Sequence, residues 1–368
     1  MKTMMLTFLL FLALLGLTHA DCIPSTRQDA PGVSIDITMA YVAIAVHFEN
    51  GTTRDIARVD GSPEYLAAMR SLAEDARIFH GLGGPPVDCT SETTQTFYPP
   101  LFIRDWWWAL RAWYGIDTET VPDPYQPDGW VDVVADTLSS IKSDILNPLG
   151  STGYDQIFTT WPDFEASTGS LYRVRFRLAC RRAGFEHLDG EIVSWHALGY
   201  DGIVLEQDED EDDEALDPRA MLVISYNAAS LGITLNIRDG GVVWPRRLIE
   251  SLEHGAAQSN GSSAYWDSVK LLLGEVIQDE PVDHILLLGS HAYEADLIRA
   301  VQDVVEQHEN IKASILERYH GQAVDARDEN LPMFMAARQA AAVARDIIRA
   351  RSCDIPNNVT SSEVHLEL

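Results

Sequence analysis

Two apolar segments stand close together in the run Val33-Ser34-Ile35-Asp36-Ile37-Thr38-Met39-Ala40-Tyr41-Val42-Ala43-Ile44-Ala45-Val46-His47-Phe48. Both are rich in β-branched residues, which favour strands, so the run predicts strand–turn–strand over 33–48. Asn50-Gly51 is a hairpin turn signal, and a third strand is expected at 53–59. The folded part of the chain therefore begins with an antiparallel hairpin.

A similar pattern returns later in the chain. Strands are expected at 221–226 and 232–238, with a short strand at 242–243. Apolar periodicity predicts helices after each hairpin, and two short apolar runs predict buried strands at 155–161 and 285–288. Because each hairpin opens a unit of strands followed by helices, the sequence predicts an α/β fold with two similar lobes and a cleft between the hairpins. The helices are expected at 63–80, 101–115, 130–146, 170–183, 245–254, 263–277, 293–307 and 331–351.

An acidic run divides the chain. Residues 206–214 contain eight carboxylates in nine positions, and such a run repels itself and favours a solvated loop. A calcium site is the alternative, but the alternating ligands and turn glycine of an EF-hand are missing. The expected organisation is a signal peptide at 1–20, lobe I at 33–205, an acidic loop at 206–217, a reduced lobe II at 218–308, crossing and C-terminal helices at 309–352, and a tail at 353–368.

Five segments, in the right order, resemble the heat-shock-chaperone ATPase domain of the actin-like ATPase superfamily. The first phosphate loop of that family reads V-G-I-D-L-G-T-T-Y, and residues 33–41 resemble it. The resemblance implies the two-lobed, ribonuclease H-like repeat of that superfamily, with a nucleotide between the lobes. The other segments are a helix at 178–185 with the crossing segment that follows it at 194–200, a second phosphate loop at 222–230, an adenosine motif at 285–290 and a second crossing helix at 335–341.

The phosphate loops depart from the family pattern. Glycines there let backbone N–H groups approach phosphates, whereas Ser34, Thr38 and Asn227-Ala228-Ala229 stand at glycine positions here, and Met39-Ala40 replaces two threonines. Ser225 stands where the family has an acidic residue. The resemblance leaves a vestigial nucleotide site, made of Asp36, Thr38, Tyr41, Ser225, Gly289 and Ser290.

Two further departures concern charge and length. The family places a catalytic lysine soon after the first phosphate loop, but the first lysine after the signal peptide is Lys142. Only 64 residues separate Ser225 from Gly289, too few for the helical subdomain that encloses adenine in the family. The expected function is that of a non-catalytic pseudo-ATPase that binds another molecule, with no catalytic residues, no metal and no cofactor.

Two enzymatic alternatives stay open. One is weak binding or hydrolysis of ATP with Mg²⁺, using Asp36 and Gly289-Ser290. The other is a secreted hydrolase using cleft carboxylates, since 56 acidic residues leave no way to select a pair. The aromatic cluster Trp106-Trp107-Trp108 with Trp113-Tyr114 is either core packing or an interaction surface.

The first 20 residues predict secretion. Lys2, an apolar run over 4–17 and Thr18-His19-Ala20 form the three-part signal-peptide pattern, with a signal anchor as the alternative. No membrane span is expected after cleavage, and the expected partner is an extracellular protein or glycan. In that compartment the sequons at Asn50, Asn260 and Asn358 can carry glycans, and Cys22, Cys89, Cys180 and Cys353 can form two disulfides with three possible connectivities.

Net charge excludes two classes of partner. The chain has 27 Lys and Arg against 56 Asp and Glu, a net charge of −29. Binding nucleic acid or an anionic membrane through a broad basic surface needs clustered lysine and arginine, so neither is expected.

Overall fold

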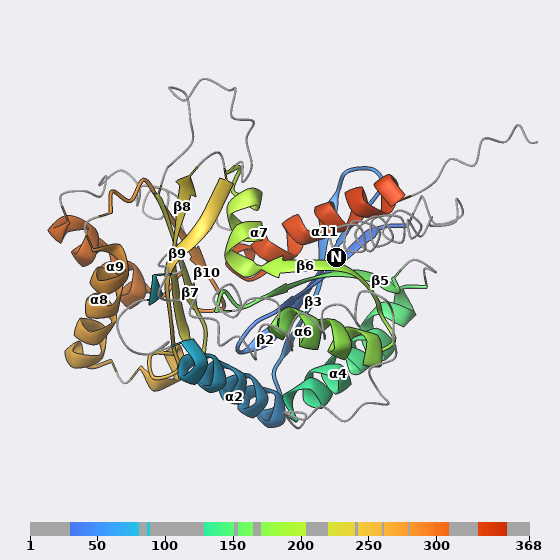
Figure 1. Ribbon diagram of the computed structural model, residues 1–368, viewed down its shortest axis with the longest axis horizontal. Helices are drawn as coiled ribbons and strands as arrows, with labels where there is room; N and C mark the ends of the chain where they lie inside the picture. The colour runs from blue at the N-terminus through green and yellow to red at the C-terminus, as the bar shows by residue number, and fades with distance from the viewer. Residues whose placement is uncertain are drawn as a thin grey trace, which may run out of the picture.

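The computed structural model of the chain describes residues 30–80, 87–88, 129–150, 154–164, 171–203, 220–239, 242–259, 261–278, 280–308 and 330–351. Within these ranges the chain forms an α/β fold with two five-stranded mixed sheets and seven α-helices (Figure 1). The sheets lie side by side, and two helices, α7 (Val193–Tyr200) and α11 (Leu331–Arg351), lie between and behind them (Figure 1).

The first sheet is built around the hairpin expected at 33–48. Its strand order is β3-β2-β1-β5-β6, in which β1 is antiparallel to β2 and parallel to β5. Ile35 pairs with Ile44 in the hairpin, and β1 and β2 are buried almost throughout, as their continuous apolar runs predict. The strands are β1 (Gly32–Ile37), β2 (Tyr41–His47), β3 (Thr53–Asp60), β5 (Gln156–Trp161) and β6 (Glu186–Ile192).

The second sheet repeats much of this order. Its strand order is β10-β7-β8-β9-β4. Strand β8 is antiparallel to both β7 and β9, and β10 is parallel to β7. Each sheet therefore has an antiparallel three-strand unit whose first strand is flanked by a parallel strand. The strands are β4 (Val87–Asp88), β7 (Ala220–Tyr226), β8 (Leu231–Asp239), β9 (Val242–Ser251) and β10 (His284–Leu288).

Helices cover the outer face of each sheet. In the sequence, each of these helices either follows a strand of that sheet or connects two of its strands. The aromatic core of the first sheet holds Trp130, Trp161 and Phe176, with the Trp161 and Phe176 rings stacked 5.4 Å apart. The covering helices are α2 (Pro63–His80), α4 (Trp130–Ile141) and α6 (Leu171–Arg182) on the first sheet, and α8 (Ser263–Ile277) and α9 (Ala295–Gln307) on the second.

The two central helices are exchanged between the sheets. Helix α7 (Val193–Tyr200) follows the first sheet but packs Ala197 and Leu198 on the second. Helix α11 (Leu331–Arg351) follows the second sheet but packs Ala337 and Ala341 on β2 of the first. A Cβ at Gly32 would lie 2.1 Å from the Ala341 carbonyl oxygen, so glycine allows α11 to lie directly on β1.

One expected helix is wrong, and two strands, β4 and β6, were not expected. Residues 245–254 were expected to be helical, but β9 runs to Ser251 and pairs along its length with β8. Pro245 lies at an irregularity in that pairing, a place where proline is tolerated in a sheet. Strand β6 was not expected, because its sequence EHLDGEI carries a polar residue at most positions.

Most other boundaries agree with expectation to within two residues. The helix expected at 130–146 is α-helical to Ile141 and then continues as a π-helical turn (Lys142–Leu146) and a 3-10 turn (Asn147–Leu149). Gly184 has a φ of +78° directly after α6, the left-handed conformation expected of its helix-ending role. Residues 1–20, the aromatic cluster at 106–114, the acidic loop at 206–217 and the tail at 353–368 lie outside the described residues.

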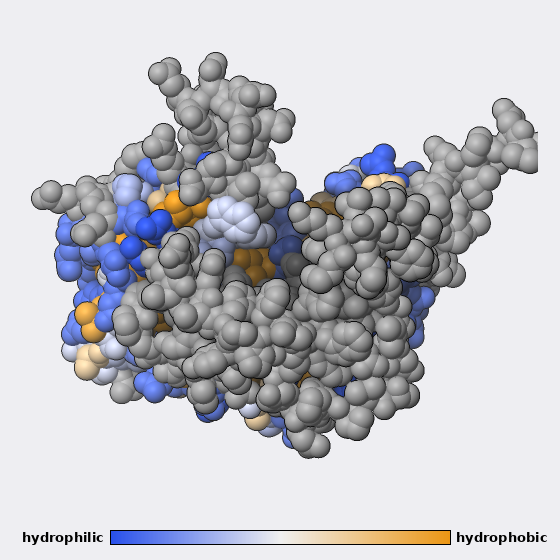
Figure 2. All heavy atoms as spheres, in the orientation of Figure 1, coloured by the Kyte–Doolittle hydropathy of each residue, from blue (hydrophilic) through white to orange (hydrophobic). Residues whose placement is uncertain are grey.

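The described surface on the α8–α9 side mixes hydrophilic with fewer hydrophobic residues (Figure 2). No helix among the described residues combines the length and the apolar character needed to cross a membrane.

Candidate functional site between the two sheets

The turns of the two hairpins meet across a small cavity. Its volume is about 30 Å³, and its walls come from both sheets and from the start of α11. A water molecule needs about 10–15 Å³ measured in this way, so the cavity has room for one or two waters. The first sheet contributes Asp36, Thr38, Tyr41 and Asp163 to the walls, and the second contributes Thr234 and Glu250.

Asp36 projects from the end of β1 into this cavity. The residue is 2% exposed, and its Oδ1 accepts a hydrogen bond of 2.6 Å from the Thr160 hydroxyl on the neighbouring strand β5. Burial, opposed by the Thr160 hydrogen bond and assisted by the nearby Asp163 carboxylate, raises the pKa of Asp36 to about 7.

Asp163 joins the two sheets. It lies just past β5, and its Oδ1 accepts a hydrogen bond from the backbone N–H of Ser194 (2.9 Å). Its Oδ2 accepts one from the hydroxyl of Thr234 on β8 of the second sheet (2.6 Å). Burial raises the pKa of Asp163 above its usual range, and these hydrogen bonds oppose the rise.

Glu250 completes a group of three carboxyls, of which Asp36 and Glu250 are buried and Asp163 is partly buried. It projects from β9, is 7% exposed, and its Oε2 would lie 2.7 Å from a Cβ at Gly232, so the glycine leaves room for it. Burial, followed by the charge of Asp163, raises its pKa to about 7. The described residues that line the cavity include no lysine or arginine. Three carboxyls therefore share an enclosed space without a cationic partner.

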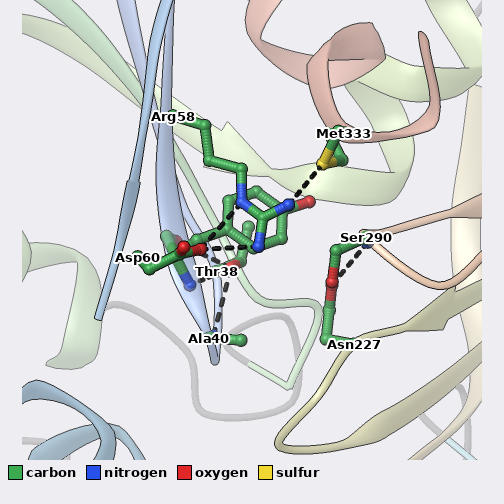
Figure 3. Close-up of polar contacts among 8 residues, drawn as sticks. Thr38, Ala40, Arg58, Asp60, Asn227, Ser290 and Met333 are labelled. Carbon is green, nitrogen blue, oxygen red and sulfur yellow. Dashed lines mark hydrogen bonds and ion pairs between the residues drawn. The ribbon is translucent and has the colours of Figure 1, made fainter. Parts of the chain in front are cut away.

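The first turn binds its own backbone. The Thr38 hydroxyl accepts hydrogen bonds from the backbone N–H groups of Ala40 (3.2 Å) and Tyr41 (3.0 Å) and donates to the Tyr41 carbonyl (2.7 Å). The turn is held from α2 as well, because the Tyr65 hydroxyl donates to the Thr38 carbonyl at 2.7 Å. Beside it, Arg58 pairs with Asp60 and reaches Met333 at the start of α11 (Figure 3).

The second turn is tied to the loop after β10. Asn227 Oδ1 accepts a hydrogen bond from the backbone N–H of Ser290 (3.2 Å), and its Nδ2 donates to the Ser225 hydroxyl (3.1 Å) (Figure 3). The Asn227 side chain therefore engages the Ser290 N–H, while the Gly289 N–H donates to the Pro332 carbonyl (3.1 Å).

Gly289 fits under this contact because it has no side chain. Its φ is +96°, and a Cβ there would lie 2.4 Å from the Tyr226 carbonyl oxygen and 2.6 Å from Asn227 Oδ1. Since the first of these atoms belongs to the backbone, the loop after β10 is packed against the hairpin with no space to spare.

The fold brings the expected site residues together. All of them but Ser290 line the cavity, and Ser290 lies at its edge through its bond to Asn227. Asp163 and Glu250 were not expected. Asp163 follows a buried strand of an α/β sheet, a position at which functional side chains gather, and this signal could have identified it. Glu250 was hidden by the mistaken helix at 245–254.

The described residues contain no group of three or more His, Cys, Asp or Glu side chains that could hold a metal ion. Three carboxyls and no described lysine or arginine line the cavity, and Asn227 already engages the Ser290 N–H, so the lining does not fit the phosphates of a nucleotide.

No protein-family model matches the chain, and no curated protein matches it significantly in sequence.

Two residues expected to be modified are described. Asn50 is exposed in the turn between β2 and β3, where its Oδ1 accepts from the Thr52 N–H (3.0 Å) and hydroxyl (2.7 Å). Cys180 is a free, fully buried thiol, and burial raises its pKa to about 12. Asn260, Asn358, Cys22, Cys89 and Cys353 lie outside the described residues, so the glycans and disulfides stay predictions.

Proposed function

We propose that the protein is a secreted, non-catalytic member of the actin-like ATPase superfamily that acts by binding another molecule. The observation that carries the proposal is the cavity between the hairpins. A space of about 30 Å³ lies where the resemblance places phosphates, and it is bounded by three carboxyls with raised pKa values. Buried carboxyls would also repel phosphate oxygens whenever they are ionised.

The strand orders support the proposed family. A repeat of β3-β2-β1-β5 in one sheet and β9-β8-β7-β10 in the other is the arrangement that a two-lobed, ribonuclease H-like repeat requires. The exchange of α7 and α11 between the sheets fits the two crossing segments that the resemblance implies.

The enzymatic alternatives are less well supported. A carboxyl with a pKa near 7 can serve as a general acid or base, so Asp36 and Glu250 have suitable chemistry for a hydrolase. A substrate must nevertheless reach the carboxyls, of which Asp36 and Glu250 are buried beside a space of about 30 Å³.

Thermal unfolding with millimolar ATP and Mg²⁺ tests the loss of nucleotide binding. We expect an unchanged melting temperature, whereas a ligand at 100 times its Kd would stabilise the fold by about 2.7 kcal/mol. The paired variants are Asp36→Asn in the cavity and Asp60→Asn on the exposed end of β3. A rise in melting temperature that is lost in Asp36→Asn and kept in Asp60→Asn would contradict the proposal.

Expression in a secreting eukaryotic cell tests the location. We expect protein in the medium whose gel mobility increases on enzymatic removal of N-glycans, with part of the change lost in Asn50→Gln, because Asn50 is exposed in a turn. Protein that stays in the cell with Met1 retained and shows no glycan-dependent mobility change would contradict secretion.

A further inference from the structure

A second space adjoins the hairpin turns from the opposite side. It is an open groove of about 660 Å³, within the range of about 300–1,000 Å³ typical of small-molecule sites. One wall is α2 with the first turn, and the other is the second turn with the 3-10 helix at Ala256–Gln258. We propose that this groove binds an uncharged, largely apolar small molecule.

Small apolar side chains shape the groove. The residues that face it include Met39, Ala40, Leu66, Ala67, Ala228 and Ala229. Leu66 is 37% exposed at the rim, and Leu252, which is 7% exposed, contributes to the floor. Alanines at the turns leave space where larger residues would fill it, so the same positions that depart from the phosphate-loop pattern produce an apolar surface that water covers poorly.

The groove is rigid on both sides. The first turn is fixed by the Tyr65 hydroxyl and by a hydrogen bond from the Gly61 N–H to the Ala40 carbonyl (2.9 Å). The second turn is fixed to the 3-10 helix, because the N–H groups of Ala256 and Ala257 donate to the carbonyls of Asn227 (2.9 Å) and Ala228 (3.0 Å). A preformed pocket reduces the entropy lost on binding, which favours a specific ligand over an adaptive contact.

Charge selects an uncharged ligand. Arg58 in the groove wall is paired with Asp60, whose Oδ1 lies 2.5 Å from Arg58 Nη2. Arg70 and Glu74 lie one turn apart on the exposed face of α2, so the charges along the groove balance. The chain as a whole carries a net charge of −29, and this field repels an anion that approaches the groove. Ser71 and Gln258 supply hydrogen-bonding groups for a polar atom of the ligand.

This inference deepens the proposed function, since it names the site and the ligand class of a protein that has lost its nucleotide. The proposed binding involves the residues of the groove alone. The test therefore uses a probe that resembles no nucleotide.

The probe is N-phenyl-1-naphthylamine, an uncharged molecule that fluoresces in apolar surroundings, titrated into the full glycosylated protein. 8-Anilinonaphthalene-1-sulfonate adds an anionic group to nearly the same body. We expect saturable binding of the uncharged probe at one site per chain and affinity for the sulfonate lower by about tenfold, which corresponds to about 1.4 kcal/mol.

Two substitutions block the groove from opposite walls. Ala67 on α2 and Ala257 in the 3-10 helix are both exposed and both line the groove, so Ala67→Trp and Ala257→Trp should fold normally and each lower the affinity for the uncharged probe at least about tenfold. Leu271→Trp, at a position on α8 that is 63% exposed, adds the same aromatic surface elsewhere and should leave binding unchanged. Circular dichroism and melting temperature confirm the fold of each variant.

Three results would overturn the inference: no saturable binding of the uncharged probe, wild-type affinity for it in both blocked variants, or tighter binding of the sulfonate. A failed probe titration with no response to ATP removes the groove as a site and leaves the loss of nucleotide binding standing. A thermal response to ATP with intact probe binding contradicts the loss of nucleotide binding and leaves the groove standing as a site.

Discussion

The two hairpin turns separate two spaces of opposite character. On one side lies a small cavity of about 30 Å³ that holds Asp36, Asp163 and Glu250, and on the other lies a more open groove of about 660 Å³ with alanine at its turns. Met39 borders both. The difference teaches that the identity of a few turn residues decides which side of a hairpin is accessible, because Asn227 closes the inner side while Ala228 and Ala229 leave the outer side open.

The largest effect is expected where the inner side is most tightly packed. In Gly289→Ala the new methyl group must lie 2.4 Å from the Tyr226 carbonyl oxygen at a φ of +96°, so strain and overpacking add. We expect the free energy of unfolding to fall by about 4 kcal/mol in urea titration.

Gly202→Ala is the matched control for this change. Gly202 has a φ of +91° but nothing within 4 Å of a Cβ, so only the backbone strain of about 1 kcal/mol applies. Equal losses in the two variants would show that the inner side can expand, and the contrast between the two spaces would then fail.

The next effect concerns pH. Burial raises the pKa values of Asp36 and Glu250 to about 7, so the folded state binds protons more tightly than the unfolded state. The stabilising contribution of these protons is fully present below the unfolded values near 4 and is lost as pH rises through 7. We expect the free energy of unfolding to fall by about 2 kcal/mol from pH 5 to pH 7 for each of the two carboxyls.

Isosteric amides provide the control. Asp36→Asn combined with Glu250→Gln keeps the shape of the cavity walls but removes both titrations, so the pH dependence should flatten. The described residues that line the groove include no buried carboxyl, and Asp60→Asn on its rim should keep the wild-type slope. Stability that rises from pH 5 to pH 7 in the wild type would show that the carboxyls are not enclosed.

The smallest effect tests the contact that closes the inner side. Asn227→Ala removes the acceptor of the Ser290 N–H and the donor to Ser225, and the loss of a buried hydrogen-bonding partner costs about 1–2 kcal/mol. Asn50→Ala removes comparable bonds to Thr52 in an exposed turn, where water replaces them, and should cost less than about 0.5 kcal/mol. Chemical denaturation measures both, and a smaller loss in Asn227→Ala than in Asn50→Ala would mean that Asn227 does not close the cavity.

Sequence reasoning was most successful where structure is local. The hairpin at 33–48 and the helix at 63–80 carry their own periodicity, and both lie where expected. The mistaken helix at 245–254 has a different origin. Leu248, Ile249 and Leu252 are spaced as on one face of a helix, but pairing with β8 decides their conformation, and that partner is not encoded in the local pattern.

The candidate site was predicted only in part for the same reason. Asp36, Ser225 and Gly289 were identified by their place in a resemblance that spans the chain. Asp163 and Glu250 belong to no such pattern among 56 acidic residues, and only the meeting of β5, β8 and β9 brings them together. The role of Asn227 was predicted in part, because the sequence showed a side chain in place of a glycine but not the hydrogen bond between Asn227 and Ser290.

The placement of α11 has a consequence for synthesis. Strands β1 and β2 leave the ribosome first, yet their inner face is covered by Ala337 and Ala341, and the Ser34 hydroxyl bonds the Ala337 carbonyl across 303 positions of sequence. Domains usually fold in order as they emerge from the ribosome. Here one apolar face of the first sheet stays uncovered until almost the whole chain has been translated. The first sheet of a nascent chain is therefore exposed to aggregation for most of its translation, and a stop codon before residue 331 removes the cover of that sheet along with the last helix.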